Sequence, residues 1–158
     1  MNIDMFFQYV KNNNIEMNFD NKEHYGAHRL SNEVLFQLPF ISLTILLLAK
    51  DRRKPKTEEI GQLVGECFEN SIRGFKGSTQ ALGWSANLRM RTVKALTFLE
   101  TARLVLVDTN NGRVKITDNG KKIVDAALAQ DSNLSINLRK ISRSYRNLSV
   151  EKQIAMGL

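Results

Sequence analysis

The sequence predicts a mainly α-helical fold with one β-hairpin. Residues 84–117 contain a capped amphipathic helix that is followed by two short, alternating, β-branched strands, Leu104–Val107 and Arg113–Ile116. Asn111 and Gly112, between the strands, favour the positive φ angles of a two-residue hairpin turn. A helix that leads directly into such a hairpin is the second half of a winged helix-turn-helix. We therefore expect a mainly α fold with a β-hairpin wing, extended at both termini.

Three regions are expected along the 158 residues. Residues 1–29 form an Asn-rich N-terminal extension, and residues 30–130 form the winged-helix domain. Residues 131–158 form a C-terminal amphipathic helix with a tail from Val150 to Leu158. A chain of this length can bury a core without disulfide bonds.

The first helix of the domain is expected to follow a cap at Ser31 or Asn32 and to run to about Lys50. Pro39 lacks an amide donor, so the helix either kinks or begins there. The segment Phe40–Leu48 is apolar nearly all round, which predicts burial on more than one side. Such a helix is either central to the core or half of an oligomer interface.

The second helix is expected to begin at Thr57, because Glu58 and Glu59 suit the positive N-terminal end of a helix. It should end by Gly74. The joint that follows, residues 75–84, is longer than the tight turn of a simple helix-turn-helix.

The third helix is expected to begin after Ser85, whose hydroxyl can accept a hydrogen bond from the first-turn amides. Helical spacing predicts its buried face: Leu88, Thr92, Ala95, Leu96 and Leu99. The opposite face is polar and partly basic: Arg91, Lys94, Thr97 and Thr101.

Two further helices are expected after the hairpin, one from Thr117 to Ala129 and one with an apolar stripe from Leu134 to Leu148. The last helix carries arginines and a lysine on its other faces, without an acidic residue among them. It either closes the domain's own core or binds a partner or a second copy. Its candidate partner-binding residues are Leu138, Arg139, Ile141, Arg143 and Tyr145.

The charge of the chain favours polyanions or acidic protein surfaces as partners. The formal net charge is +7 and the isoelectric point is near 9.7, which favours either class equally. From Asn70 to Leu99 there is no Asp or Glu. A solvated basic face without any partner is the alternative. The candidate DNA contacts are Arg89, Arg91, Lys94, Arg113 and Lys115.

No catalytic, cofactor or metal site is predicted. The sequence contains no phosphate-binding loop and no nucleophile elbow, and its acidic residues are scattered. His24 and His28 lie one helical turn apart near Asp20 and Glu23, but no third ligand accompanies them, so we interpret them as surface histidines. We expect a protein that is not an enzyme.

Membrane and compartment signals are also few. The apolar stretch Leu38–Ala49 is too short to span a bilayer, and no cleavable signal pattern is present at the N-terminus. One cysteine, Cys67, suits a reducing compartment. We therefore expect a cytoplasmic protein without a membrane partner.

The segment Leu82–Val124 resembles winged-helix proteins of the broad MarR-like kind. Those proteins show a recognition helix that ends in L-x-x-x-G-L-V and a wing followed by L-T-x-x-G. In this chain Ala102 and Arg103 stand where that pattern prefers Gly. The backbone after the recognition helix can therefore differ from that of MarR-like proteins.

Three further features occur together: a Leu30-Ser31-Asn32 start before an apolar helix, a basic Arg53-Lys54-Pro55 linker, and Trp84 ahead of the run TVKALTFLETARLV. This layout, over residues 28–124, resembles the middle components of three-component ABC systems. These are small winged-helix proteins encoded beside an SMC-like ATPase and an effector, including the Lamassu type of anti-phage defence.

The resemblance implies a non-catalytic adaptor that joins the ATPase to its effector, expected to be a nuclease, with DNA as a further candidate partner. The alternative is a homodimeric winged-helix transcriptional regulator that binds DNA through its third helix and wing. Both hypotheses predict the same fold. They differ in what the basic surfaces contact.

Overall fold

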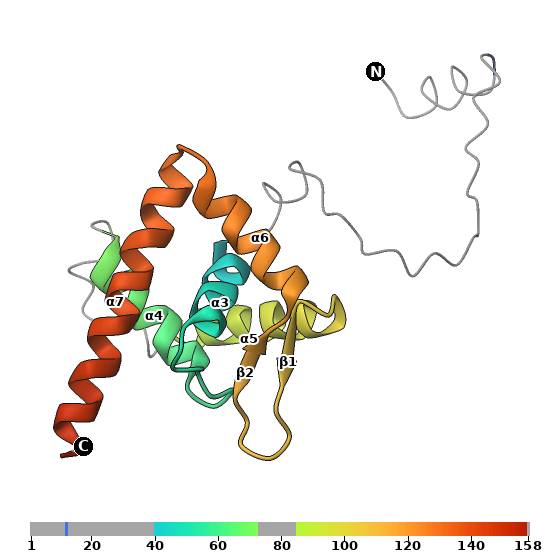
Figure 1. The fold of residues 1–158 in the computed structure, drawn as a ribbon. Helices are drawn as coiled ribbons and strands as arrows, with labels where there is room; N and C mark the ends of the chain where they lie inside the picture. The colour runs from blue at the N-terminus through green and yellow to red at the C-terminus, as the bar shows by residue number, and fades with distance from the viewer. Residues whose placement is uncertain (1–11, 13–39, 73–84, 158) are drawn as a thin grey trace.

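The computed structural model describes residue 12 and residues 40–72 and 85–157 of the chain. This part is mainly helical with one two-stranded antiparallel sheet, which confirms the expected helices and hairpin (Figure 1). Its elements, in order, are α3 (Phe40–Lys50), α4 (Ile60–Ser71), α5 (Ala86–Thr101), β1 (Val105–Val107), β2 (Val114–Ile116), α6 (Asp118–Ala129) and α7 (Asn133–Ala155).

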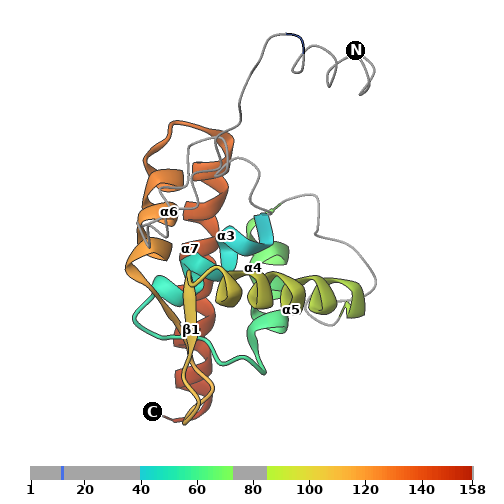
Figure 2. The ribbon, with the colours of Figure 1, turned by 90° about the vertical axis from the view of Figure 1, so that its right-hand side faces the viewer.

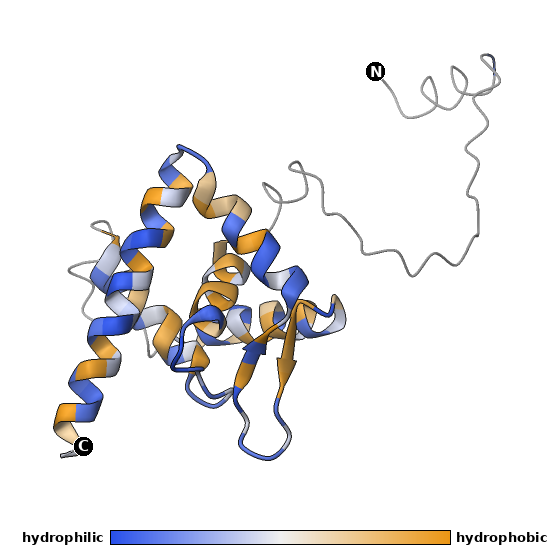
Figure 3. Ribbon diagram, viewed as in Figure 1, coloured by the Kyte–Doolittle hydropathy of each residue, from blue (hydrophilic) through white to orange (hydrophobic). Residues whose placement is uncertain are grey.

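Helix α3 lies at the centre of the fold, in contact with α4, α5, α6, α7 and β2. Every residue from Ser42 to Ala49 is buried, and Figure 3 shows α3 hydrophobic along most of its length. The hydroxyl of Thr44 donates to the carbonyl of Phe40 over 2.9 Å, so its burial leaves no donor unsatisfied. The predicted burial on more than one side is confirmed. The cap predicted at Ser31 or Asn32 lies outside the described residues.

Helix α4 begins at Ile60 rather than at the predicted Thr57. The amide of Thr57 donates to the carbonyl of Gly112 over 2.9 Å, and residues 56–59 form a turn. The prediction was wrong because the backbone of this segment pairs with the distant hairpin instead of starting a helix. The helix ends at Ser71, which agrees with the predicted end by Gly74.

The two strands pair in antiparallel register, with Val105 opposite Ile116 and Val107 opposite Val114. The side chains of Val105 in β1 and Val114 in β2 are buried. The middle residue of each strand, Leu106 in β1 and Lys115 in β2, is exposed. The alternation predicted for the hairpin is confirmed.

The turn of the hairpin is longer than the predicted two-residue turn. The amide of Gly112 donates to the carbonyl of Asp108 over 2.8 Å, and the amide of Asp108 donates to the carbonyl of Arg113 over 2.9 Å. Gly112 has a φ of 65°, but Asn111 lies outside the positive-φ region. The carboxylate of Asp108 accepts from the amide of Asn110 over 3.0 Å, a local bond that favours this wider loop.

Helix α5 begins after Ser85 as predicted, since the hydroxyl of Ser85 accepts from the amide of Leu88. At its other end the amide of Leu104 donates to the carbonyl of Leu99 over 2.8 Å, and that of Arg103 donates to the carbonyl of Glu100 over 3.0 Å. These two bonds form a Schellman cap. Arg103, at the position where MarR-like proteins prefer Gly, takes a φ of 57°, so the helix exit keeps the geometry that Gly would give.

Helix α6 packs closely against the end of α5. The hydroxyl of Thr117 accepts from the amide of Gly120 and itself lies 2.9 Å from the carbonyl of Arg103. A Cβ atom at Gly120 would stand only 2.3 Å from the carbonyl oxygen of Leu104. Thr117 therefore caps α6, and Gly120 allows this close approach.

Helix α7 lies on the opposite side of α3 from the hairpin (Figures 1 and 2). A capping box of Ser132 and Ser135 begins it, and the hydroxyl of Tyr145 donates to the carbonyl of Arg53. The predicted tail from Val150 continues as helix to Ala155, because no helix-breaking residue precedes Gly157. Residues 150–157 are all exposed.

Replacing Arg103 by Gly is expected to raise the free energy of unfolding by about 0.5–1 kcal/mol. Gly occupies the left-handed region without the steric penalty of a Cβ atom. The matched variant Arg91→Gly, in the exposed middle of α5, should lower the free energy of unfolding by about 1 kcal/mol. Urea denaturation measures both changes. A destabilised Arg103→Gly variant would contradict this account of the cap.

Candidate functional site

The outward face of α5 is only partly basic. Arg91 and Lys94 are exposed, as predicted, but their neighbours Met90 and Val93 expose 57% and 59% of their surface. The hydroxyl of Thr97 donates to the carbonyl of Val93 over 3.0 Å, so its proton points back to the helix. The face therefore combines two cations with an apolar centre.

Arg89 lies on a different flank of α5. Arg91 follows it by two positions, which corresponds to about 200° around a helix. Its stem runs beside Gly61 of α4, where an added Cβ atom would be 3.3 Å from the Cγ atom of Arg89. Arg89 thus lies next to α4 rather than beside Lys94.

The two cations predicted on the wing are both exposed, and both have partners within the chain. The Nζ atom of Lys115 lies 2.7 Å from the Oδ2 atom of Asp108, and this hydrogen bond lowers the pKa of the Asp108 carboxyl. The guanidinium of Arg113 donates to the carbonyl of Lys54 over 2.9 Å. Because Arg89 and Arg91 lie on different flanks of α5, the five predicted DNA contacts do not share one face.

The predicted partner-binding residues of α7 fall into two groups. Leu138, Ile141 and Tyr145 are buried in the chain's own core, the arrangement that the sequence left open as an alternative. Arg139 and Arg143 are exposed, and the guanidinium of Arg139 donates to the carbonyl of Leu128 at the end of α6 over 3.0 Å. In this fold only the two arginines are accessible to a partner.

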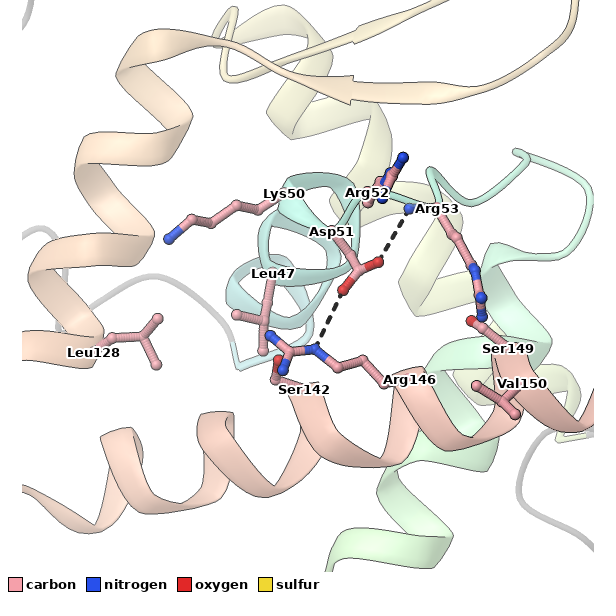
Figure 4. A pocket seen from close by; sticks show the side chains of 10 residues that line it. All are labelled: Leu47, Lys50, Asp51, Arg52, Arg53, Leu128, Ser142, Arg146, Ser149 and Val150. Atoms are coloured by element: carbon pink, nitrogen blue, oxygen red, sulfur yellow. Dashed lines mark hydrogen bonds and ion pairs between the residues drawn. The ribbon is translucent and has the colours of Figure 1, made fainter.

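A pocket of about 580 Å³ lies between the C-terminal end of α3, the end of α6 and α7 (Figure 4). We call it the basic pocket, after its charged lining residues: Lys50, Asp51, Arg52, Arg53 and Arg146. The sequence shows a basic run after α3 and several arginines in the last helix, but it does not indicate that these two segments line one pocket. The packing of α7 beside the end of α3 brings them together.

Cys67 lies in the core between helices, fully buried. Burial raises the pKa of its thiol to about 12, so the thiol stays protonated and is a poor nucleophile at neutral pH. In the described ranges 40–72 and 85–157, no three His, Cys, Asp or Glu side chains gather as metal ligands. His24 and His28 lie outside these ranges.

Comparisons with known protein families, curated proteins and solved structures give no match to this chain. Among the helices that the structure describes, none is long and apolar enough to cross a membrane.

Burial of Cys67 predicts a pH-dependent stability. The native chain holds the thiol proton up to about pH 12, whereas the unfolded thiol loses it near pH 9.0. Between these values the native state binds more protons, so this contribution to the free energy of unfolding is complete below pH 9.0 and falls above it. The fall is at most ~1.4 kcal/mol per pH unit.

Urea denaturation from about pH 8 to about pH 10 measures this dependence. The variant Cys67→Ala should lose stability less steeply than the wild type above pH 9.0, because it has no thiol to deprotonate. Equal slopes in both proteins would show that the thiol does not cause the dependence.

Proposed function

We propose that this chain is a winged helix-turn-helix protein. The order of α3, α4 and α5, followed by the hairpin, supports this fold. The segment between α3 and α4 adds a short pairing to the wing: Lys56 forms a β-bridge with Arg113, and the amide of Val114 donates to the carbonyl of Pro55 over 2.9 Å. The wing is thus fastened to the helical domain along β2.

For its function, we propose a non-catalytic adaptor subunit in the cytoplasm that links an SMC-like ABC ATPase to its effector in a Lamassu-type defence complex. The class of partner comes from the sequence resemblance over residues 28–124. The adaptor role is supported by one observation above the others: the exposed apolar side chains of Met90 and Val93 at the centre of the outward face of α5.

This face suits a protein partner better than base recognition. Side chains that read base edges in the major groove need hydrogen-bonding groups directed outward. At the centre of α5 stand Met90 and Val93, and the hydroxyls of Thr97 and Thr101 donate to carbonyls of their own helix. Exposed apolar side chains with polar neighbours are typical of protein interfaces.

A second apolar surface lies at the end of α7. Ile154 and Met156 expose 72% and 67% of their surface, and Val150 lies one turn before Ile154. The α7 end and the outward face of α5 belong to different elements on different sides of α3 (Figure 1). Two separate apolar surfaces are what a subunit that joins two other proteins requires.

The adaptor proposal predicts co-purification. A tagged chain expressed with its gene neighbours, and treated with nuclease to remove bridging DNA, should retain an SMC-like ATPase in stoichiometric amount. Val93→Asp should abolish this retention, because a carboxylate would be buried without a partner in the interface. The matched control Ile136→Asp, at an exposed apolar position on α7, should retain the ATPase.

Two results would contradict this proposal. A wild-type chain that purifies without an SMC-like ATPase would refute the adaptor function. Full retention by Val93→Asp would exclude the face of α5 as the ATPase contact, even if the complex forms.

A homodimeric transcriptional regulator is the second candidate. The exposed pair Arg91 and Lys94 favours it, since neither side chain has a charged partner among the described residues. Cations one helical turn apart on an outward face can neutralise DNA phosphates.

Lys94→Ala tests this candidate. Binding to duplex DNA should weaken for all sequences alike, and the slope of log affinity against log salt should flatten by about one unit. The exposed Lys122 of α6 provides a matched control, Lys122→Ala, that should leave the slope unchanged. Unaltered binding by Lys94→Ala would show that α5 does not enter DNA.

A further inference from the structure

The basic pocket joins three parts of the chain that are far apart in sequence. The end of α3 and the loop after it provide Lys50 to Arg53, α6 provides Leu128, and α7 provides Arg146. In Figure 4, Asp51 lies between the side chains of Arg53 and Arg146, with Lys50 on the side of α6, while Arg52 points away from α7.

The cations of the pocket outnumber its acidic partners. Lys50 pairs with Asp125 of α6, and the Nε atom of Arg146 lies 3.6 Å from the Oδ2 atom of Asp51. The guanidinium of Arg53 donates to the neutral amide oxygen of Gln153 over 2.7 Å. Arg52 also belongs to the lining, so the lining residues and the paired Asp125 together hold four cations and two carboxylates, and the net charge is positive.

The ion pair at the centre of the pocket is weak. Arg146 leaves 69% of its side chain exposed, whereas Asp51 leaves 18%, and such a pair contributes little in water. Asp51 also accepts from the amide of Arg53 over 3.0 Å, which holds the carboxylate in place. Arg146 can therefore exchange Asp51 for another anion without loss of the local backbone structure.

The remaining lining residues are three apolar side chains and two serines, Ser142 and Ser149. Leu47, Leu128 and Val150 lie among the charged side chains, so the pocket offers apolar contact beside positive charge. Its volume of about 580 Å³ is in the range of sites that bind small ligands. Guanidinium groups suit phosphate oxygens in particular, because their donors match two oxygens at once.

We propose that the basic pocket binds a phosphate group carried by a nucleotide or by a nucleic-acid strand. Arg146 contacts the phosphate, and Lys50 and Arg53 flank it from either side of Asp51. The apolar lining contacts the sugar or base. This site is separate from the outward face of α5 and does not depend on the adaptor function.

Fluorescence anisotropy at low salt tests the proposal, with a labelled single-stranded oligonucleotide and a fluorescent ATP analogue as the two probes. At least one probe should bind the full chain, and the probe that binds identifies the source of the phosphate. Arg146→Gln and Arg53→Gln should each weaken that binding about tenfold. The matched control Lys140→Gln, on the same helix but outside the pocket, should leave it unchanged.

A variant with the opposite effect makes the test sharper. Asp51→Asn removes the competing charge but keeps an oxygen that accepts from the amide of Arg53, so binding should tighten about two- to fivefold. Thermal unfolding shows that each variant is folded.

Three results would overturn the proposal: no binding of either probe, equal binding by Arg146→Gln and Lys140→Gln, or weaker binding by Asp51→Asn. If Lys94→Ala abolished probe binding and Arg146→Gln did not, the phosphate contact would lie on α5, and the proposal would be equally overturned. Co-purification with the ATPase is a separate measurement, so the two proposals can fail independently.

Discussion

Burial of α3 on every side is the constraint on which the rest of the fold depends. A helix that is apolar all round must be covered all round, and α4, α5, α6, α7 and β2 together provide that cover. Leu43, Ile45, Leu46 and Leu48 are fully buried, and each contributes roughly 1.5–3 kcal/mol by leaving water. Because α5 and α7 both pack on α3, this helix also positions the two surfaces that carry the candidate functions.

The loop that follows α3 connects this helix to the hairpin and to α7. The carbonyl of Arg53 accepts from the hydroxyl of Tyr145 on α7, and the carbonyl of the next residue, Lys54, accepts from the guanidinium of Arg113 on the hairpin. Two neighbouring peptide groups thus fasten opposite sides of the molecule. The predicted wing cation Arg113 has this structural role in addition to its exposed position.

Local sequence signals predicted the cap at Ser85 and the buried face of α5 correctly, because their causes lie within a few residues. Ser85 caps α5, the buried face of α5 follows helical spacing, and the helix predicted to start at Thr117 has that residue as its cap. The start of α4 was mispredicted because the amide of Thr57 pairs with Gly112, far along the chain. Arg103 shows a third case: the two bonds of the Schellman cap and the hydroxyl of Thr117, which donates to the Arg103 carbonyl over 2.9 Å, accompany a backbone conformation that a non-glycine residue does not favour.

The same distinction explains why the candidate sites were predicted only in part. Helical periodicity identifies an apolar stripe, but it does not determine whether the stripe packs on the core of the same chain or on a partner. In α7, Leu138 and Ile141 of the stripe are buried in the core of this chain. A cluster of charges on one helix can be recognised in the sequence. The basic pocket combines charges from the end of α3 and from α7, and this combination depends on how the helices pack. Asp51 brings these cations together without neutralising all of them, and an anion that enters the basic pocket finds its contacts already in place.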